Sequence, residues 1–270
     1  MSAIVQCESC GGTVVFDAEF ESSKCLFCGS SDLAAPQEGE EEEPSPDFAL
    51  SLQIGREQAD TQYREWATSS WWNPKELRSL QVELRLMYLP AWWIRGEVES
   101  HWGGLISANT KSRKAPTSGL ERATYEDIVA ASQGLSSAEL AELLPFVLED
   151  AQPWSELSHE IPFEVPGMSE EAARGVIHER LSSAHLSDIQ TKESLLSGVS
   201  SSFVHEESHQ LYMLPVYIGA FRFREQPWRF LINAQTGEVV GDAPVDRTKI
   251  GLVIGVTLLI FGLVALMANA

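Results

Sequence analysis

All four cysteines of this 270-residue chain lie within its first 28 residues, as two Cys-x-x-Cys pairs. Cys7 and Cys10 form the first pair and Cys25 and Cys28 the second, with fourteen residues between the pairs. This spacing is typical of a tetrahedral zinc site with four thiolate ligands. So short a segment buries too little apolar surface to fold alone, and metal ligation would supply the missing stability. The pattern predicts a zinc ribbon over residues 1–33.

The predicted metal is Zn²⁺ in a structural site. Four thiolates fill the zinc coordination shell, so we expect Cys7, Cys10, Cys25 and Cys28 to be ligands and the site to have no catalytic role. The alternative is four free or redox-active thiols. It is disfavoured because the bases that would lower a thiol pKa are nearly absent from this segment.

Negative charge is concentrated around the ribbon. Residues 1–47 contain eleven acidic residues and one basic residue, which is half of the formal net charge of −20. Much of this charge is the run of glutamates at 38 and 40–43, followed by Pro44-Ser45-Pro46. Like charges beside prolines repel one another and bury no apolar surface, so residues 34–47 are predicted to form an acidic Pro/Glu linker. An acidic recognition tail is the alternative.

The C-terminal end carries a long apolar run. Residues 250–268 contain no charged side chain, and a helix of this length spans roughly 28 Å, close to the hydrocarbon thickness of a bilayer. They predict a single transmembrane helix, with a buried core helix as the alternative. Arg247 and Lys249 precede the run, and the N-terminus lacks a signal-peptide layout. The expected location is the cell inner membrane, single-pass, with the bulk of the chain cytoplasmic.

Two glycines in the same run suggest a contact between copies of the chain. Gly251 and Gly255 are four residues apart and lie on one face of a helix. Small residues at this spacing let two helices approach closely. The sequence therefore suggests a homodimer through Gly251 and Gly255.

The segment between the linker and the apolar run, residues 48–246, is predicted to form an α+β domain with an antiparallel sheet and helices. Two parts of it share a plan, in which an amphipathic helix precedes an aromatic strand with a Leu-Pro step. The two steps, Leu89-Pro90 and Leu214-Pro215, are 125 residues apart. This suggests an internal duplication. The suggested boundaries are repeats at 48–104 and 160–243 and a helical insert at 115–159.

Local signals mark helix starts and one turn. Ser136-Ser137-Ala138-Glu139 is a capping box, and Ser169 can cap a second helix. Asn233-Ala234-Gln235-Thr236-Gly237, between two apolar segments, predicts a hairpin turn with Gly237 in the left-handed conformation. We expect this turn to serve the shape of the chain, and a ligand role is the alternative.

These motifs carry a resemblance. The N-terminal Cys-x-x-Cys pairs, the strand Met213-Leu214-Pro215-Val216-Tyr217 and the turn that begins at Asn233 together resemble bacterial TFIIB-type zinc-ribbon-containing proteins, many of them membrane proteins of unknown function. Ala234 stands where the family pattern tends to have glycine. The resemblance implies the four cysteines as zinc ligands and no catalytic residue. Some such proteins are labelled primosomal or helicase-like, but this chain has no Gly-x-x-x-x-Gly-Lys-Ser/Thr phosphate loop.

One further motif matches a catalytic pattern. His205-Glu206-Glu207-Ser208-His209 fits His-Glu-x-x-His, which in metalloproteases binds zinc from one face of a helix. The flanking sequence predicts a strand instead. In an extended chain residues 205 and 209 stand about 13 Å apart, too far to share one zinc. A solvent-facing strand is the favoured interpretation.

The sequence favours a membrane-anchored zinc-ribbon protein that binds a protein partner through the ribbon and has no catalytic activity. No nucleophile, base and oxyanion site are assembled by any motif. One alternative is a membrane-bound zinc hydrolase that uses His205, Glu206 and His209. The other is a nucleic-acid-associated ribbon protein, which is disfavoured because residues 1–33 carry five acidic residues and one basic residue.

Overall fold

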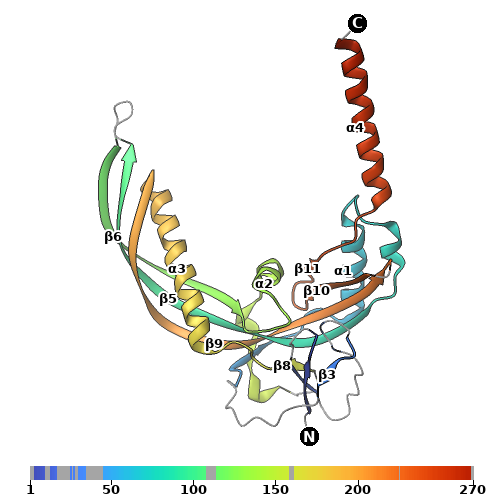
Figure 1. Cartoon of the computed structure of the whole chain (residues 1–270). Coiled ribbons are helices and arrows are strands. Elements are labelled where there is room, and N and C mark those ends of the chain that lie inside the picture. Colours follow the sequence, from blue (N-terminus) through green and yellow to red (C-terminus); the bar gives the residue numbers. More distant parts are fainter. Residues whose placement is uncertain are drawn as a thin grey trace.

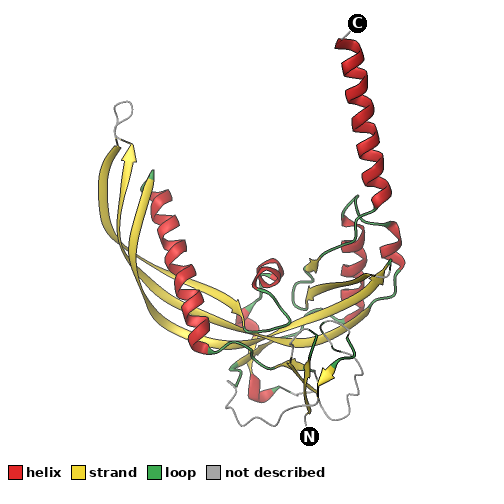
Figure 2. Cartoon of the chain, in the orientation of Figure 1, coloured by secondary structure: helices red, strands yellow, loops and turns green. Residues whose placement is uncertain are grey.

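The structure is a computed structural model that describes residues 3–9, 13–16, 25, 27, 30–34, 45–107, 114–157, 161–224 and 226–268. Within these residues the chain has the expected α+β fold, with helices packed on one mixed sheet of eleven strands (Figures 1 and 2). The strands are β1 (Ala3–Cys7), β2 (Thr13–Phe16), β3 (Leu33–Ala34), β4 (Phe48–Leu50), β5 (Glu83–Ser107), β6 (Lys114–Ala130), β7 (Ala151–Pro153), β8 (Phe163–Glu164), β9 (Ser197–Phe223), β10 (Gln226–Asn233) and β11 (Val239–Gly241). The helices are α1 (Arg56–Ser69), α2 (Ser137–Leu143), α3 (Glu170–Lys192) and α4 (Arg247–Ala268), with 3-10 turns η1 (Lys75–Ser79), η2 (Leu148–Asp150) and η3 (Trp154–Glu156).

The two longest strands, β5 and β9, form the centre of the sheet. They pair antiparallel over residues 83–105 and 197–220, and Leu89 lies opposite Leu214. The two Leu-Pro steps are therefore neighbours in space. β6 extends one end of the sheet along β5, and β10 with β11 extends the other end beside β9. The sheet curves, so that both ends rise like arms from a central base (Figure 1).

Each half of the domain repeats the order short strand, helix, long strand. The first half is β4–α1–β5 and the second is β8–α3–β9. Each short strand pairs in parallel with the long strand of the other half, with Phe48 opposite Tyr212 and Phe163 opposite Tyr88. Because these two pairings are reciprocal, an approximate two-fold axis at the centre of the β5–β9 ladder relates the halves. These two parallel pairings make the sheet mixed, whereas the sequence predicts an antiparallel one.

Helix α1 covers one end of the sheet. Its apolar residues Ala59, Tyr63 and Ala67 recur at helical spacing and are buried, and α1 is the amphipathic helix predicted before the first aromatic strand. They pack with Phe221 and Phe230 of β9 and β10. The Tyr63 ring stacks on Phe230 with 4.7 Å between ring centroids. This aromatic contact fixes α1 against the arm that leads to α4.

Helix α3 covers the other end of the same face. Ala173, Ile177 and Leu181 are buried in one cluster with Trp92 and Ile94 of β5. Side chains alternate along a strand, and these β5 positions are even-numbered, like the β5 residues below α1. Helices α1 and α3 therefore lie on one face, and no described helix packs over the other face of the sheet where residues 114–124 of β6 pair with β5.

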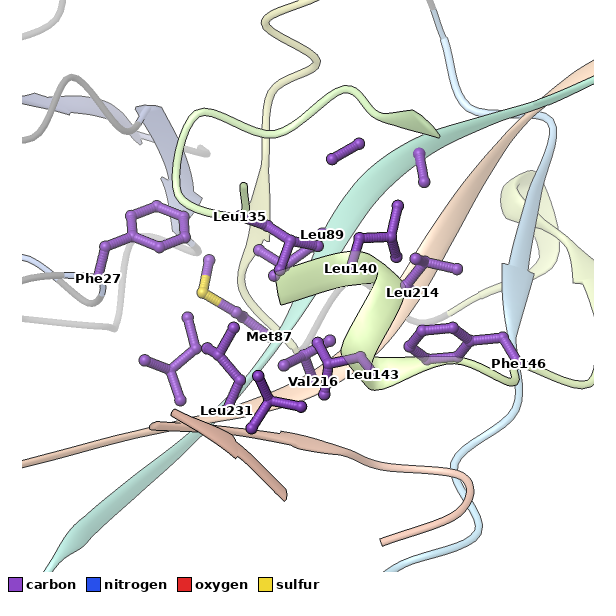
Figure 3. Close-up of a cluster of buried hydrophobic side chains, with 14 of the residues drawn as sticks. Phe27, Met87, Leu89, Leu135, Leu140, Leu143, Phe146, Leu214, Val216 and Leu231 are labelled. Atoms are coloured by element: carbon purple, nitrogen blue, oxygen red, sulfur yellow. The ribbon is translucent and has the colours of Figure 1, made fainter. Parts of the chain in front are cut away.

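Helix α2 packs on the opposite face at the centre of the sheet. Leu140 and Leu143 point into a cluster with Leu89, Leu214 and Val216 (Figure 3). Full burial of each such leucine contributes roughly 1.5–3 kcal/mol to stability. The short helix thus closes the core above the point where the two halves meet.

The predicted caps and turn are confirmed. Ser136 accepts a hydrogen bond from the Glu139 amide, and the Glu139 carboxylate accepts one from the Ser136 amide, which completes the capping box. The Ser169 hydroxyl caps α3 by accepting from the Ala172 amide. Gly237 has φ of +83°, in the left-handed region that the hairpin turn requires.

The predicted helical insert differs from the structure. The segment from Lys114 onwards is the long strand β6, which pairs with β5 along its whole length. Only residues 137–143 within the expected insert form an α-helix. Polar side chains alternate with partly buried ones along β6, so its period of two is not visible as a hydrophobic pattern.

The C-terminal apolar run requires a correction. It folds as α4, which extends away from the rest of the molecule (Figure 1). In the part of the chain that the structure describes, no helix reaches the length and apolar character needed to cross a membrane. Such a crossing takes about 20 predominantly apolar residues. The prediction of a transmembrane helix at 250–268 is therefore wrong, and the inner-membrane location that rested on it stays untested.

Candidate functional site

Two of the four predicted zinc ligands are placed by the structure. Cys7 ends β1 and Cys25 precedes a turn, and both are buried in the central hydrophobic cluster. Cys10 and Cys28 lie outside the described residues. Among the residues that are described, no group of three or more potential metal ligands forms. The four-cysteine zinc site therefore stays a prediction.

The turn after Cys25 has the local geometry that a zinc-binding thiolate needs. The backbone amide of Phe27 donates a hydrogen bond to Cys25 Sγ across 3.4 Å. A donor aimed at sulfur stabilises the charged thiolate over the neutral thiol. The donor set and this amide fit Zn²⁺ in a structural role.

The ribbon segment packs directly on the sheet. Phe27 is only 1 % exposed. A Cβ atom at Gly134 would lie 2.1 Å from the Phe27 ring, so a glycine is required there. Arg85 on β5 donates to the Cys25 carbonyl across 3.2 Å, and β2 pairs with β8. The sequence predicts a ribbon joined only by an acidic linker, whereas the described part of the ribbon is a layer of the domain itself.

A buried carboxylate lies beneath this contact. Glu164 of β8 is fully buried and accepts hydrogen bonds from the Gln133 amide at 2.8 Å and the Gly134 amide at 3.1 Å. The Ser132 hydroxyl donates to it as well. Burial raises the pKa of Glu164 from 4.5 to about 7, against the opposing effect of these donors. Glu164 thus holds the turn on which Phe27 rests.

The His-Glu-x-x-His motif lies in strand β9, as predicted. Glu207 forms a β-bulge, because Ser208 and Glu206 pair with consecutive residues of β5. The bulge brings Glu206 and His209 to the face covered by α3. His205 lies on the opposite face, so the two histidines cannot share one zinc. The hydrolase alternative loses its ligand pair.

An arginine occupies the centre of the remaining polar cluster. Arg174 of α3 lies 2.8 Å from a Glu170 oxygen and 3.2 Å from a Glu206 oxygen. Glu206 also contacts His178 Nε2 at 2.6 Å, and His209 contacts Glu170 at 3.2 Å. A guanidinium between these carboxylates supplies the positive charge that a metal ion would supply. The cluster therefore ties α3 to β9.

A pocket with a volume of about 220 Å³ opens on the face of the sheet that carries α2. It lies between the strand pair β5–β6 and the loop that follows α2. Its lining residues are Trp93 of β5, Glu126, Asp127 and Ile128 of β6, and Leu144, Pro145, Phe146 and Leu148 of the loop.

The turn after β10 builds one side of this pocket. Asn233 Nδ2 donates to the carbonyls of Leu143 at 2.8 Å and Pro145 at 3.0 Å. Gln235 Oε1 accepts from the Val147 amide at 2.9 Å. Both amide side chains are buried, so they fix the loop in one position. The turn thus has a structural role, as the sequence predicts, and it holds the loop that forms one wall of the pocket.

No protein-family model, curated protein or solved structure matches the chain. The resemblance to TFIIB-type zinc-ribbon-containing proteins therefore stays a prediction based on the cysteine pairs and the hairpin turn.

Proposed function

We propose that the chain is a non-catalytic binding protein in which a structural zinc ribbon braces the base of a long sheet. The observation that carries this proposal is the position of Phe27. Its ring is buried in the main core while its amide donates to Cys25 Sγ. Zinc at Cys7, Cys10, Cys25 and Cys28 would hold this turn closed and keep the core covered.

Among the described residues, exposed apolar side chains on one face of strands β5, β6 and β9 support binding as the activity. Leu120, Val199 and Phe203 are 51 %, 74 % and 57 % exposed, and all three lie on the face that α3 does not cover. Large apolar side chains gathered on an open sheet often mark an interaction surface. We therefore place the partner on the sheet and not on the ribbon, whose described part is packed against the domain.

The zinc content of the purified full chain tests the proposal. We expect one zinc per chain in the wild type, loss of that zinc in Cys25→Ser, and no change in His209→Ala. The last variant is the matched control, because it alters the other candidate zinc motif. A wild type without zinc would contradict the proposal. A second zinc that disappears in His209→Ala would contradict it as well and would favour the hydrolase.

A further inference from the structure

The pocket between β5, β6 and the loop after α2 carries an inference that rests on the proposed binding function and specifies a ligand for it. Its volume of about 220 Å³ is below the roughly 300–1,000 Å³ of typical small-molecule sites. A cavity of this size suits one side chain of a partner. The question is which side chain its walls would select.

The floor and walls of the pocket are apolar and aromatic. Trp93 is partly buried, and its ring meets Tyr212 edge to face with 6.2 Å between centroids. Ile128 and Phe146 are each 8 % exposed and belong to the central core. The position of Phe146 is set by the buried Asn233 and Gln235 amides described above. The aromatic surface is therefore held in place before a ligand arrives.

The mouth of the pocket carries an available negative charge. The Glu126 side chain is exposed, and its carboxylate has no hydrogen bond or ion pair within the described part of the chain. Arg95 lies directly opposite it on β5, but the Arg95 guanidinium pairs with Glu207 at 3.0 Å. Asp127 is already engaged by the Ile128 amide and by Arg180. Glu126 is thus the carboxylate left to meet a ligand.

The geometry points to a site for one cationic side chain, arginine or lysine, of a protein partner. The charged end would lie between the Trp93 ring and the Glu126 carboxylate, and the alkyl part would extend out of the pocket to the backbone of the partner. An aromatic face attracts a cation, and a neighbouring carboxylate adds a direct charge pair. The formal charge of −20 would draw a basic partner toward the site.

Fluorescence anisotropy with a labelled Gly-Gly-Arg-Gly-Gly peptide and the full chain tests this assignment. Citrulline in place of arginine keeps the shape and removes the charge, so we expect about tenfold weaker binding. Glu126→Gln and Trp93→Leu should each weaken binding of the arginine peptide by a similar factor. Glu97→Gln is the matched control, because it removes one charge from the same face of β5 outside the pocket.

Three outcomes would overturn the assignment. Equal losses in Glu126→Gln and Glu97→Gln would show attraction by overall charge. Equal binding of the arginine and citrulline peptides would show that the pocket does not recognise a cation. Methylguanidinium that binds as tightly as the peptide would assign the pocket to a free organic cation. The zinc content of the wild type and Cys25→Ser is unaffected by these outcomes, so the two proposals fail separately.

Discussion

Glu164 makes the stability of the folded chain depend on pH at the turn against which Phe27 packs. Its folded-state pKa of about 7 lies above the ordinary value of 4.5 because the side chain is buried. Between these two values the folded chain binds a proton that the unfolded chain releases. The stability due to this group is therefore complete below about pH 4.5 and is lost as the pH rises through about 7.

We predict that Glu164→Gln removes this loss. A neutral amide oxygen can still accept from the Gln133 and Gly134 amides, and no buried charge forms at high pH. The wild type should lose about 3 kcal/mol of unfolding free energy between pH 4.5 and 8 relative to the variant. Urea denaturation at several pH values measures this difference. The exposed residue Glu142 provides the control, and Glu142→Gln should behave like the wild type; a Glu164→Gln profile parallel to the wild type would refute the prediction.

At the scale of residues, sequence patterns predict features that depend only on near neighbours in the chain. The Ser136 and Ser169 caps and the left-handed Gly237 follow from the chemistry of a few neighbouring residues, and all three are confirmed. The pocket residues Trp93 and Glu126 could not be predicted, because they become neighbours only when β5 pairs with β6. The usable signal was the pair of amides at Asn233 and Gln235.

Among the elements that the structure describes, α4 exposes most of its apolar side chains. Its first turn is held by Lys249 Nζ, which donates to the carbonyls of Trp71 and Asn73 at 2.7 and 2.8 Å. Beyond that turn, side chains such as Leu258 and Phe261 are 66 % and 68 % exposed. A continuous apolar surface of this kind is normally covered. We propose that a second copy of the chain covers it.

The two glycines of α4 provide the test. A Cβ atom at Gly251 or Gly255 would meet nothing within 4 Å, so a substitution there leaves the single chain intact. We predict that Gly255→Leu abolishes dimers in sedimentation velocity runs, because it blocks the close approach of two helices. Thr257→Leu, on the opposite side of the helix, should leave the dimer unchanged. A monomeric wild type, or sedimentation with lipid vesicles in place of self-association, would contradict the proposal.

The long strands show where reading elements from sequence succeeds and fails. The helices at 56–69 and 170–192 were predictable because their apolar residues recur at helical spacing. Strand β6 was not predictable, because it is stabilised by pairing with β5 and packing against α3, which are contacts between segments distant in the sequence. Hydrophobicity alone also misjudged the C-terminal run, whose helical form is confirmed while its crossing of a membrane is not.

Across the whole molecule, the ribbon and the sheet share one core, so we predict that they unfold together. Removing zinc with a chelator should lower the melting temperature of the whole domain by about 6–10 °C, the effect of losing the packing of one buried phenylalanine in a domain of this size. Differential scanning calorimetry measures this shift. Phe27→Ala should imitate the chelator, and Phe203→Ala, which alters an exposed ring, should not. Two separate transitions, of which only one responds to zinc, would show an independent ribbon.

The overall organisation was only partly predictable. The α+β class and the helix-then-strand plan of the halves follow from composition and periodicity. The docking of the ribbon could not be inferred, because the acidic segment that precedes Phe48 gives no sign of where Phe27 packs. The exchange of β4 and β8 between the halves was equally hidden, since each involves only a few residue pairs.

The central ladder has a consequence for how the chain acquires its structure. β5 and β9 are joined by residues 108–196, so their pairing brings together segments about a hundred residues apart. Contacts of such high sequence separation slow folding, because the entropy cost of closing a long loop comes before any hydrogen bond of the ladder can offset it. During synthesis, β5 and β6 emerge well before β9. Until β9 is made, the edge of β5 that pairs with it has no strand to bind. An unpaired strand edge is a template for aggregation, so we expect the chain to be most prone to aggregate during this interval.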